Sequence, residues 1–77
     1  MTIWPTSANI VPIERRARCL QNAAFDLRQH AIEGGNIEGW RLARRMREAT
    51  TQHQCGLVER ELNIYLQRHP VSLSDVA

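Results

Sequence analysis

The most constraining feature of this sequence is a set of apolar residues spaced alternately four and three apart. The set comprises Ile13, Ala17, Leu20, Ala24, Leu27 and Ala31. At about 100° per residue, this spacing keeps every member on one side of an α-helix. Pro12 fits the first turn of such a helix, where the N–H that proline lacks would have no partner, and Asn9 is a candidate cap. The sequence therefore predicts a first helix over residues 12–34.

Two adjacent glycines and an asparagine follow this helix. Gly34 and Gly35 can adopt the left-handed conformations that end a helix, and they offer no side chain to continue the apolar pattern. The side chain of Asn36 can accept a hydrogen bond from an N–H in the first turn of a new helix. We therefore expect a tight turn here, and a short connection of this kind makes the two helices antiparallel neighbours.

The second helical segment contains no clear break. The stretch from Trp40 to Cys55 has no Pro, Gly, Asn or Asp, although Thr51 with Gln54 resembles a weak capping box. Seven apolar residues on both sides of this point fall within one half of a continuous helical wheel: Ile37, Trp40, Ala43, Met46, Val58, Leu62 and Tyr65. We therefore expect one long helix over residues 36–69, ended by Pro70 and bent near 50–56, in preference to two separate helices.

These lengths predict one all-α domain over residues 1–77, an antiparallel helical hairpin with an overhanging second helix and a tail at 70–77. The apolar residues of the overhang need a cover, which the extended arm at residues 1–11 or a second copy of the chain can supply. The predicted dimer or arm contacts are Trp4, Val58, Leu62 and Tyr65. We expect a homodimer in which two hairpins form a four-helix arrangement. The core is predicted to include Leu20, Leu27, Met46 and Leu62.

No pattern in this sequence indicates catalysis, a metal or a cofactor. His53 and Cys55 are two residues apart, so they point to different sides of a helix, and no C-x-x-C or H-x-x-x-H spacing is present. A two-helix hairpin also offers no cleft for a nucleophile and a base, and its carboxylates fit a solvated face. We therefore expect no enzymatic activity, no metal ion and no cofactor.

The expected location is the cytoplasm, away from any membrane. Residues 1–12 contain no basic residue and no long apolar run, and two cysteines are too few for a disulfide framework. No apolar run approaches the roughly 18 residues that a membrane span needs.

Basic residues are unusual in this chain because all ten are arginine. Arg41, Arg44 and Arg45 lie within about two turns of the second helix, and a further group lies near the start of the first helix. Two basic patches can contact two phosphate tracks, so nucleic-acid binding is the alternative function. The formal net charge of only +2 and the interleaved glutamates weigh against it.

Apolar residues that lie off the core stripe favour protein binding instead. Phe25 and Ile32 are seven residues apart, so they share a direction away from the stripe, with Arg18 on the same side. Aromatic and aliphatic side chains rimmed by arginine are typical of protein interfaces. The predicted protein-binding residues are Arg18, Phe25, Ile32, Arg41, Arg44 and Arg45.

The sequence thus predicts a non-enzymatic protein-protein interaction module that masks a surface of a larger protein, as a small regulator, adaptor or inhibitor. In size and shape such a chain is similar to small dimeric four-helix-bundle regulators. Compact standalone chains of this kind are often encoded by phages or mobile elements, although no motif in this chain carries that analogy.

Overall fold

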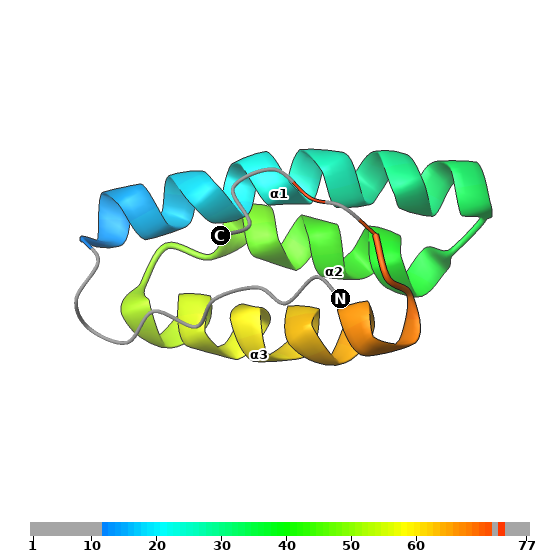
Figure 1. The fold of residues 1–77 in the computed structure, drawn as a ribbon. Helices are drawn as coiled ribbons and strands as arrows, with labels where there is room; N and C mark the ends of the chain where they lie inside the picture. The colour runs from blue at the N-terminus through cyan, green and yellow to red at the C-terminus, as the bar shows by residue number, and fades with distance from the viewer. Residues whose placement is uncertain (1–11, 72, 74–77) are drawn as a thin grey trace.

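The chain folds into three α-helices that lie side by side and alternate in direction. The computed structural model describes residues 12–71 and residue 73, and this part contains no strand. Helix α1 covers Ile13–Gly34, α2 covers Ile37–Glu48 and α3 covers Gln52–Arg68. Figure 1 shows α2 between α1 and α3, so the shortest helix lies beside both of the longer ones. The all-α class is confirmed, whereas the two-helix hairpin is wrong.

The turn between α1 and α2 forms as the sequence predicts. Gly35 has the left-handed conformation, with φ 65° and ψ 31°. The N–H groups of Gly35 and Asn36 donate to the carbonyls of Ile32 and Ala31 at 3.3 and 2.8 Å, which is the Schellman pattern. The side chain of Asn36 accepts from the N–H of Gly39 at 3.1 Å and so caps α2.

The predicted continuous second helix is wrong, because the chain reverses at residues 49–51. Ala49 has an extended backbone, and the side chain of Thr51 accepts from the N–H of Gln54 at 3.1 Å. The carboxamide oxygen of Gln54 accepts in turn from the N–H of Thr50 at 3.0 Å. The weak capping signal in the sequence therefore marks a real helix start, and the break lies where the prediction placed only a bend.

The core fills the space between the three helices. It consists of buried apolar residues from each helix and one residue beyond α3: Leu20, Ala23, Ala24, Leu27, Leu42, Ala43, Met46, Ala49, Cys55, Val58, Leu62, Tyr65, Leu66 and Leu73. The predicted core residues Leu20, Leu27, Met46 and Leu62 are all fully buried, so that prediction is confirmed. Leu73 lies in the segment at 70–77 that the sequence predicts to be a tail, yet it is buried.

The overhanging end of the second helix does not exist, because α3 folds back beside α2. Val58, Leu62 and Tyr65 consequently lie in the chain's own core, so their predicted assignment to a dimer or arm contact loses its premise. Trp4 and the arm at residues 1–11 lie outside the described residues. The four-helix arrangement of two such hairpins therefore remains a prediction without the overhang on which it was based.

A buried ion pair joins α1 to α3, and nothing in the sequence pattern predicted it. The guanidinium of Arg16 donates from Nε to both carboxylate oxygens of Glu59, at 3.2 and 3.1 Å, and from Nη2 to Oε1. Its Nη1 donates to the side-chain oxygen of Gln52. Arg16 and Glu59 are only 8 % and 2 % exposed. The hydrogen bond to Glu59 is the main cause that raises the pKa of Arg16 above its ordinary value.

Candidate functional site

The candidate sites are two surface grooves, one on each side of α2, and the exposed surface of α2 is rich in arginine. Each helix supplies residues to the core, yet large apolar side chains on all three helices remain exposed. These exposed residues are Phe25, Ile32, Ile37, Trp40, Leu57 and Ile64. Exposed apolar side chains that gather in hollows, rather than lying singly, indicate contact surfaces. Two grooves, one on each side of α2, contain five of these six residues.

The first groove, between α1 and α2, is named here the aromatic groove. Its larger part has a volume of about 640 Å³ and is lined by Gln21, Phe25, Arg28, Arg44, Arg47 and Glu48. It continues into a hollow of about 180 Å³ that shares the three arginines and adds Trp40 and Ala43. Phe25 is 60 % exposed and Trp40 is 40 % exposed, so both rings are accessible to a partner.

The aromatic groove is positively charged. Three arginines line it against one glutamate, which gives this groove as much net charge as the whole chain, +2. Arg44 lies 3.8 Å from Glu48, and both side chains are about two-thirds exposed, so this ion pair is weak and easily exchanged for another partner. Within the described part of the chain, Arg28 and Arg47 have no carboxylate at ion-pair distance.

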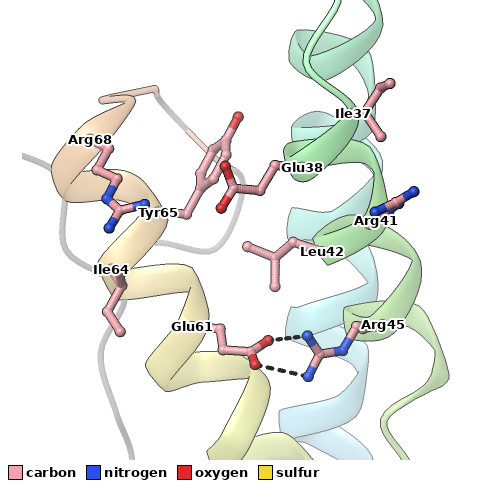
Figure 2. Close-up of a pocket in the computed structure, with 9 residues that line it drawn as sticks. All are labelled: Ile37, Glu38, Arg41, Leu42, Arg45, Glu61, Ile64, Tyr65 and Arg68. Atoms are coloured by element: carbon pink, nitrogen blue, oxygen red, sulfur yellow. Dashed lines mark hydrogen bonds and ion pairs between the residues drawn. The ribbon is translucent and has the colours of Figure 1, made fainter.

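The second groove, between α2 and α3, is named here the aliphatic groove. Figure 2 shows its main part, about 520 Å³, lined by Ile37, Glu38, Arg41, Leu42, Arg45, Glu61, Ile64, Tyr65 and Arg68. A smaller hollow of about 180 Å³ shares Arg45 and extends toward the turn at residues 49–51, where Leu57 is exposed. The groove therefore follows α3 from Arg68 back to Leu57.

An ion pair crosses the middle of the aliphatic groove. Arg45 on α2 and Glu61 on α3 meet at 2.5 Å between Nη1 and Oε2, with a second contact of 2.9 Å from Nη2 to Oε1 (Figure 2). This two-point contact balances the two charges and joins α2 to α3 across the groove. Arg41 and Arg68 line the same groove, and among the described residues neither has an ion-pair partner.

Tyr65 closes one end of the aliphatic groove and joins α3 to the first turn of α2. Its hydroxyl accepts a hydrogen bond of 3.0 Å from the side-chain nitrogen of Asn36. Gly39 makes this approach possible, since a Cβ there would lie 2.5 Å from the Tyr65 hydroxyl oxygen. Burial, followed by the nearby carboxylate of Glu38, raises the pKa of Tyr65, while the bond from Asn36 lowers it.

The structure divides the predicted protein-binding residues between two surfaces. Phe25 and Arg44 line the aromatic groove, whereas Arg41 and Arg45 line the aliphatic groove. Arg18 and Ile32 are exposed on α1 but line neither groove. The six residues are therefore all accessible, yet they do not form one patch.

Sequence reasoning missed several residues that line these grooves. The predicted buried stripe includes Ile37 and Trp40, which are exposed, and the predicted binding residues do not include Arg28, Arg47 and Arg68. A helical wheel drawn for α2 alone and centred on Leu42 and Met46 would have placed Trp40 beside the arginines.

The described residues contain no arrangement that would hold a metal. No group of three His, Cys, Asp or Glu side chains converges in this part of the chain. Cys19 is partly buried and Cys55 fully buried, and burial raises the pKa of the Cys55 thiol, so Cys55 is a poor nucleophile. Among the described helices, none combines the length and hydropathy required to cross a bilayer.

No family model matches the chain, and comparisons with curated proteins and with solved structures gave no match. The chemistry of the two grooves is therefore what indicates a function.

Proposed function

We propose that this chain is a non-enzymatic protein-binding module that acts by covering a surface of a larger protein, as a regulator, adaptor or inhibitor. The observation that supports this most directly is the aromatic groove. Phe25 lies in the middle of α1, is 60 % exposed, and shares a groove with three arginines and the continuing hollow at Trp40. Aromatic residues and arginine are the side chains most enriched where protein interfaces gain their affinity.

The charge of the aromatic groove indicates the kind of partner. A matching surface would place aspartate or glutamate side chains opposite Arg28, Arg44 and Arg47, around an apolar residue that contacts Phe25. A symmetric homodimer through this groove would instead set arginines against arginines, because a two-fold axis brings the same patch together. We therefore propose a different, acidic protein as the partner. The exposed side chains of Phe25 and Ile32 on α1 leave the homodimer predicted from the sequence as the alternative to this partner.

Nucleic-acid binding is the second candidate, and one observation favours it. Trp40 lies beside Arg28, Arg44 and Arg47, and an aromatic ring among arginines can stack on an unpaired base. Glu48 in the same groove opposes phosphate binding, and the exposed Ile32 and Leu57 have no use on a phosphate-binding surface. Protein binding explains more of the exposed side chains.

Affinity capture from cells that express the chain, followed by mass spectrometry, tests the proposal. The bait is compared with the variant Phe25→Ala/Arg44→Ala and with the control Arg15→Ala/Arg60→Ala, which removes two exposed arginines outside both grooves. We expect one protein to be captured by the wild type and by the control but not by the groove variant. Nuclease treatment should leave this protein bound. Direct titration of the purified partner should then show the same order of affinities.

Three results would contradict this function. Equal capture by the groove variant would remove the aromatic groove from the interaction. Loss of binding after nuclease, with affinity for single-stranded nucleic acid that falls steeply with salt, would establish the second candidate. A doubled mass in light scattering that Phe25→Ala and Ile32→Ala abolish would show that a second copy occupies this edge.

A further inference from the structure

We propose that the aliphatic groove is a second docking surface, which binds an acidic amphipathic helix of a partner protein. This surface lies on the other side of α2 from the aromatic groove, so it adds to the proposed function and does not depend on it.

The apolar part of the groove has the spacing that a helix recognises. Ile64 and Leu57 are both exposed and lie seven residues apart on α3, which corresponds to roughly 10.5 Å along the helix axis. A docked helix presents apolar side chains at i and i+7 with the same rise, and further anchors at i+3 or i+4 between them. Leu42 provides a buried floor and Ile37 an exposed rim on the α2 side.

The polar part of the groove selects acidic side chains. Arg45 and Glu61 neutralise one another across the groove. This leaves Arg41 and Arg68 without ion-pair partners among the described residues, against a single glutamate, Glu38, which lies beside Tyr65 (Figure 2). The excess charge is positive and flanks the apolar surface, so carboxylates on either side of the helix's apolar face would complement it.

The helical walls of the aliphatic groove favour a helical occupant over an extended one. The groove is bounded by two helices and no strand edge exists among the described residues, so an extended peptide would find no backbone partners. A helix satisfies its own backbone hydrogen bonds and contributes only side chains, which is what this groove can receive.

Fluorescence anisotropy with a designed peptide tests the proposal. The probe is a labelled helix of about 16 residues with leucines at i, i+4 and i+7 and glutamates on the flanks of that face. Two control peptides carry lysine in place of glutamate or the same residues in scrambled order. The full chain should bind the acidic helix saturably, and both controls at least about tenfold more weakly.

Matched variants then locate the binding site. Arg41→Ala/Arg68→Ala should weaken binding of the acidic helix about tenfold, whereas Arg28→Ala/Arg47→Ala removes the same charge from the aromatic groove and should change it less than about twofold. Ile64→Ser, at a half-exposed position, should reduce binding without loss of helicity by circular dichroism. Phe25→Ala should have no effect.

Failure of this proposal is distinguishable from failure of the protein-binding function. Equal binding of the acidic and lysine peptides, an absence of saturation up to about 1 mM, or full binding by Arg41→Ala/Arg68→Ala would overturn the acidic helix and leave the Phe25 experiment unaffected. Loss of peptide binding in Phe25→Ala would place the peptide in the aromatic groove and also overturn it. A concentration-dependent doubling of mass that Ile64→Ser abolishes would show that a second copy fills the groove instead.

Discussion

Arg16 and Glu59 are 43 residues apart in sequence, yet their side chains form a buried ion pair between α1 and α3. The guanidinium contacts the carboxylate through two nitrogens and reaches Gln52 through the third. Because the backbones of α1 and α3 approach each other at few positions, this pair is a direct link between the first helix and the last.

Removal of one partner of this ion pair should destabilise the fold strongly. Glu59→Leu or Arg16→Met alone leaves an uncompensated charge in a buried position, and we expect a loss of about 3 kcal/mol in the free energy of unfolding. The double variant Arg16→Met/Glu59→Leu should be less destabilised than the sum of the single changes. Urea denaturation of the four proteins measures this coupling, and additive effects would show that the pair contributes no specific interaction.

Gly39 should resist a substitution that usually stabilises helices. Glycine to alanine in a helix interior normally gains about 1 kcal/mol, but a Cβ at Gly39 would lie 2.5 Å from the hydroxyl oxygen of Tyr65 and 3.2 Å from Cβ of Ala31. We expect Gly39→Ala to lower the stability by about 1–3 kcal/mol. Thermal unfolding checks this.

Gly56 provides the matched control for that experiment. A Cβ at Gly56 in α3 would meet only Arg16 Nη2, at an ordinary 3.7 Å, so Gly56→Ala should raise the melting temperature. Addition of Tyr65→Phe to Gly39→Ala should recover part of the loss, because the closest clashing atom is then absent. A Gly39→Ala protein as stable as Gly56→Ala would mean that α2 and α3 are further apart than described.

Tyr65 should titrate above the ordinary tyrosine pKa. It is the only tyrosine in the chain, so the phenolate absorbance reports this residue alone. Burial raises its pKa, and we expect the absorbance midpoint of the folded protein to lie above about 10 and to return to about 10 in denaturant.

The same shift makes stability depend on alkaline pH. A raised pKa means that the folded state holds the neutral phenol more tightly, so this stabilisation is complete below the unfolded pKa of about 10 and is lost as the pH rises through the higher folded value. Tyr65→Phe should flatten that alkaline decline, at the cost of the hydrogen bond from Asn36, about 1 kcal/mol. An identical pH profile in Tyr65→Phe would assign the decline to other groups.

Phe25 and Leu27 should behave oppositely although they are two residues apart. Leu27 is fully buried, so Leu27→Ala should cost about 2–5 kcal/mol. Phe25 is exposed, and Phe25→Ala should change the free energy of unfolding by less than about 0.5 kcal/mol. Chemical denaturation compares them, and equal destabilisation would show that the aromatic groove belongs to the fold.

The parts of the fold that depend on local chemistry could be predicted from the sequence. The turn at Gly35 and Asn36 needs one left-handed residue and one cap, and both are visible as residue types. The core positions Leu20 and Leu27 follow from one strong stripe on a single helix. The exposed position of Phe25 follows from the same stripe, because that residue points away from it.

The break between α2 and α3 could not be predicted because the wrong residues defined the stripe of α2. Ile37 and Trp40 are exposed, and the buried residues of α2 centre on Met46. On one continuous helix, the buried residues of α2 and those of α3 would lie about 155° apart at 100° per residue, so no single face could bury both sets. Chain reversal at residues 49–51 resolves this conflict.

The long-range polar contacts also could not be predicted from the sequence. Arg16 and Arg45 are two of ten arginines, and nothing in their local spacing distinguishes the arginine that pairs with Glu59 from the one that pairs with Glu61. The predicted binding residues fall on two surfaces for the same reason. Arg44 and Arg45 are neighbours in sequence but face grooves on opposite sides of α2.

The position of α2 links events on its two sides. Twelve residues of one helix supply a wall to the aromatic groove and a wall to the aliphatic groove. A rigid displacement of α2 toward an occupant on one side is at the same time a displacement away from the other side, so it narrows one groove as it widens the other. If an occupant displaces α2 in this way, occupancy of the two grooves is thermodynamically coupled, and the effect of the first occupant on the affinity for the second is matched by an equal effect in the reverse direction.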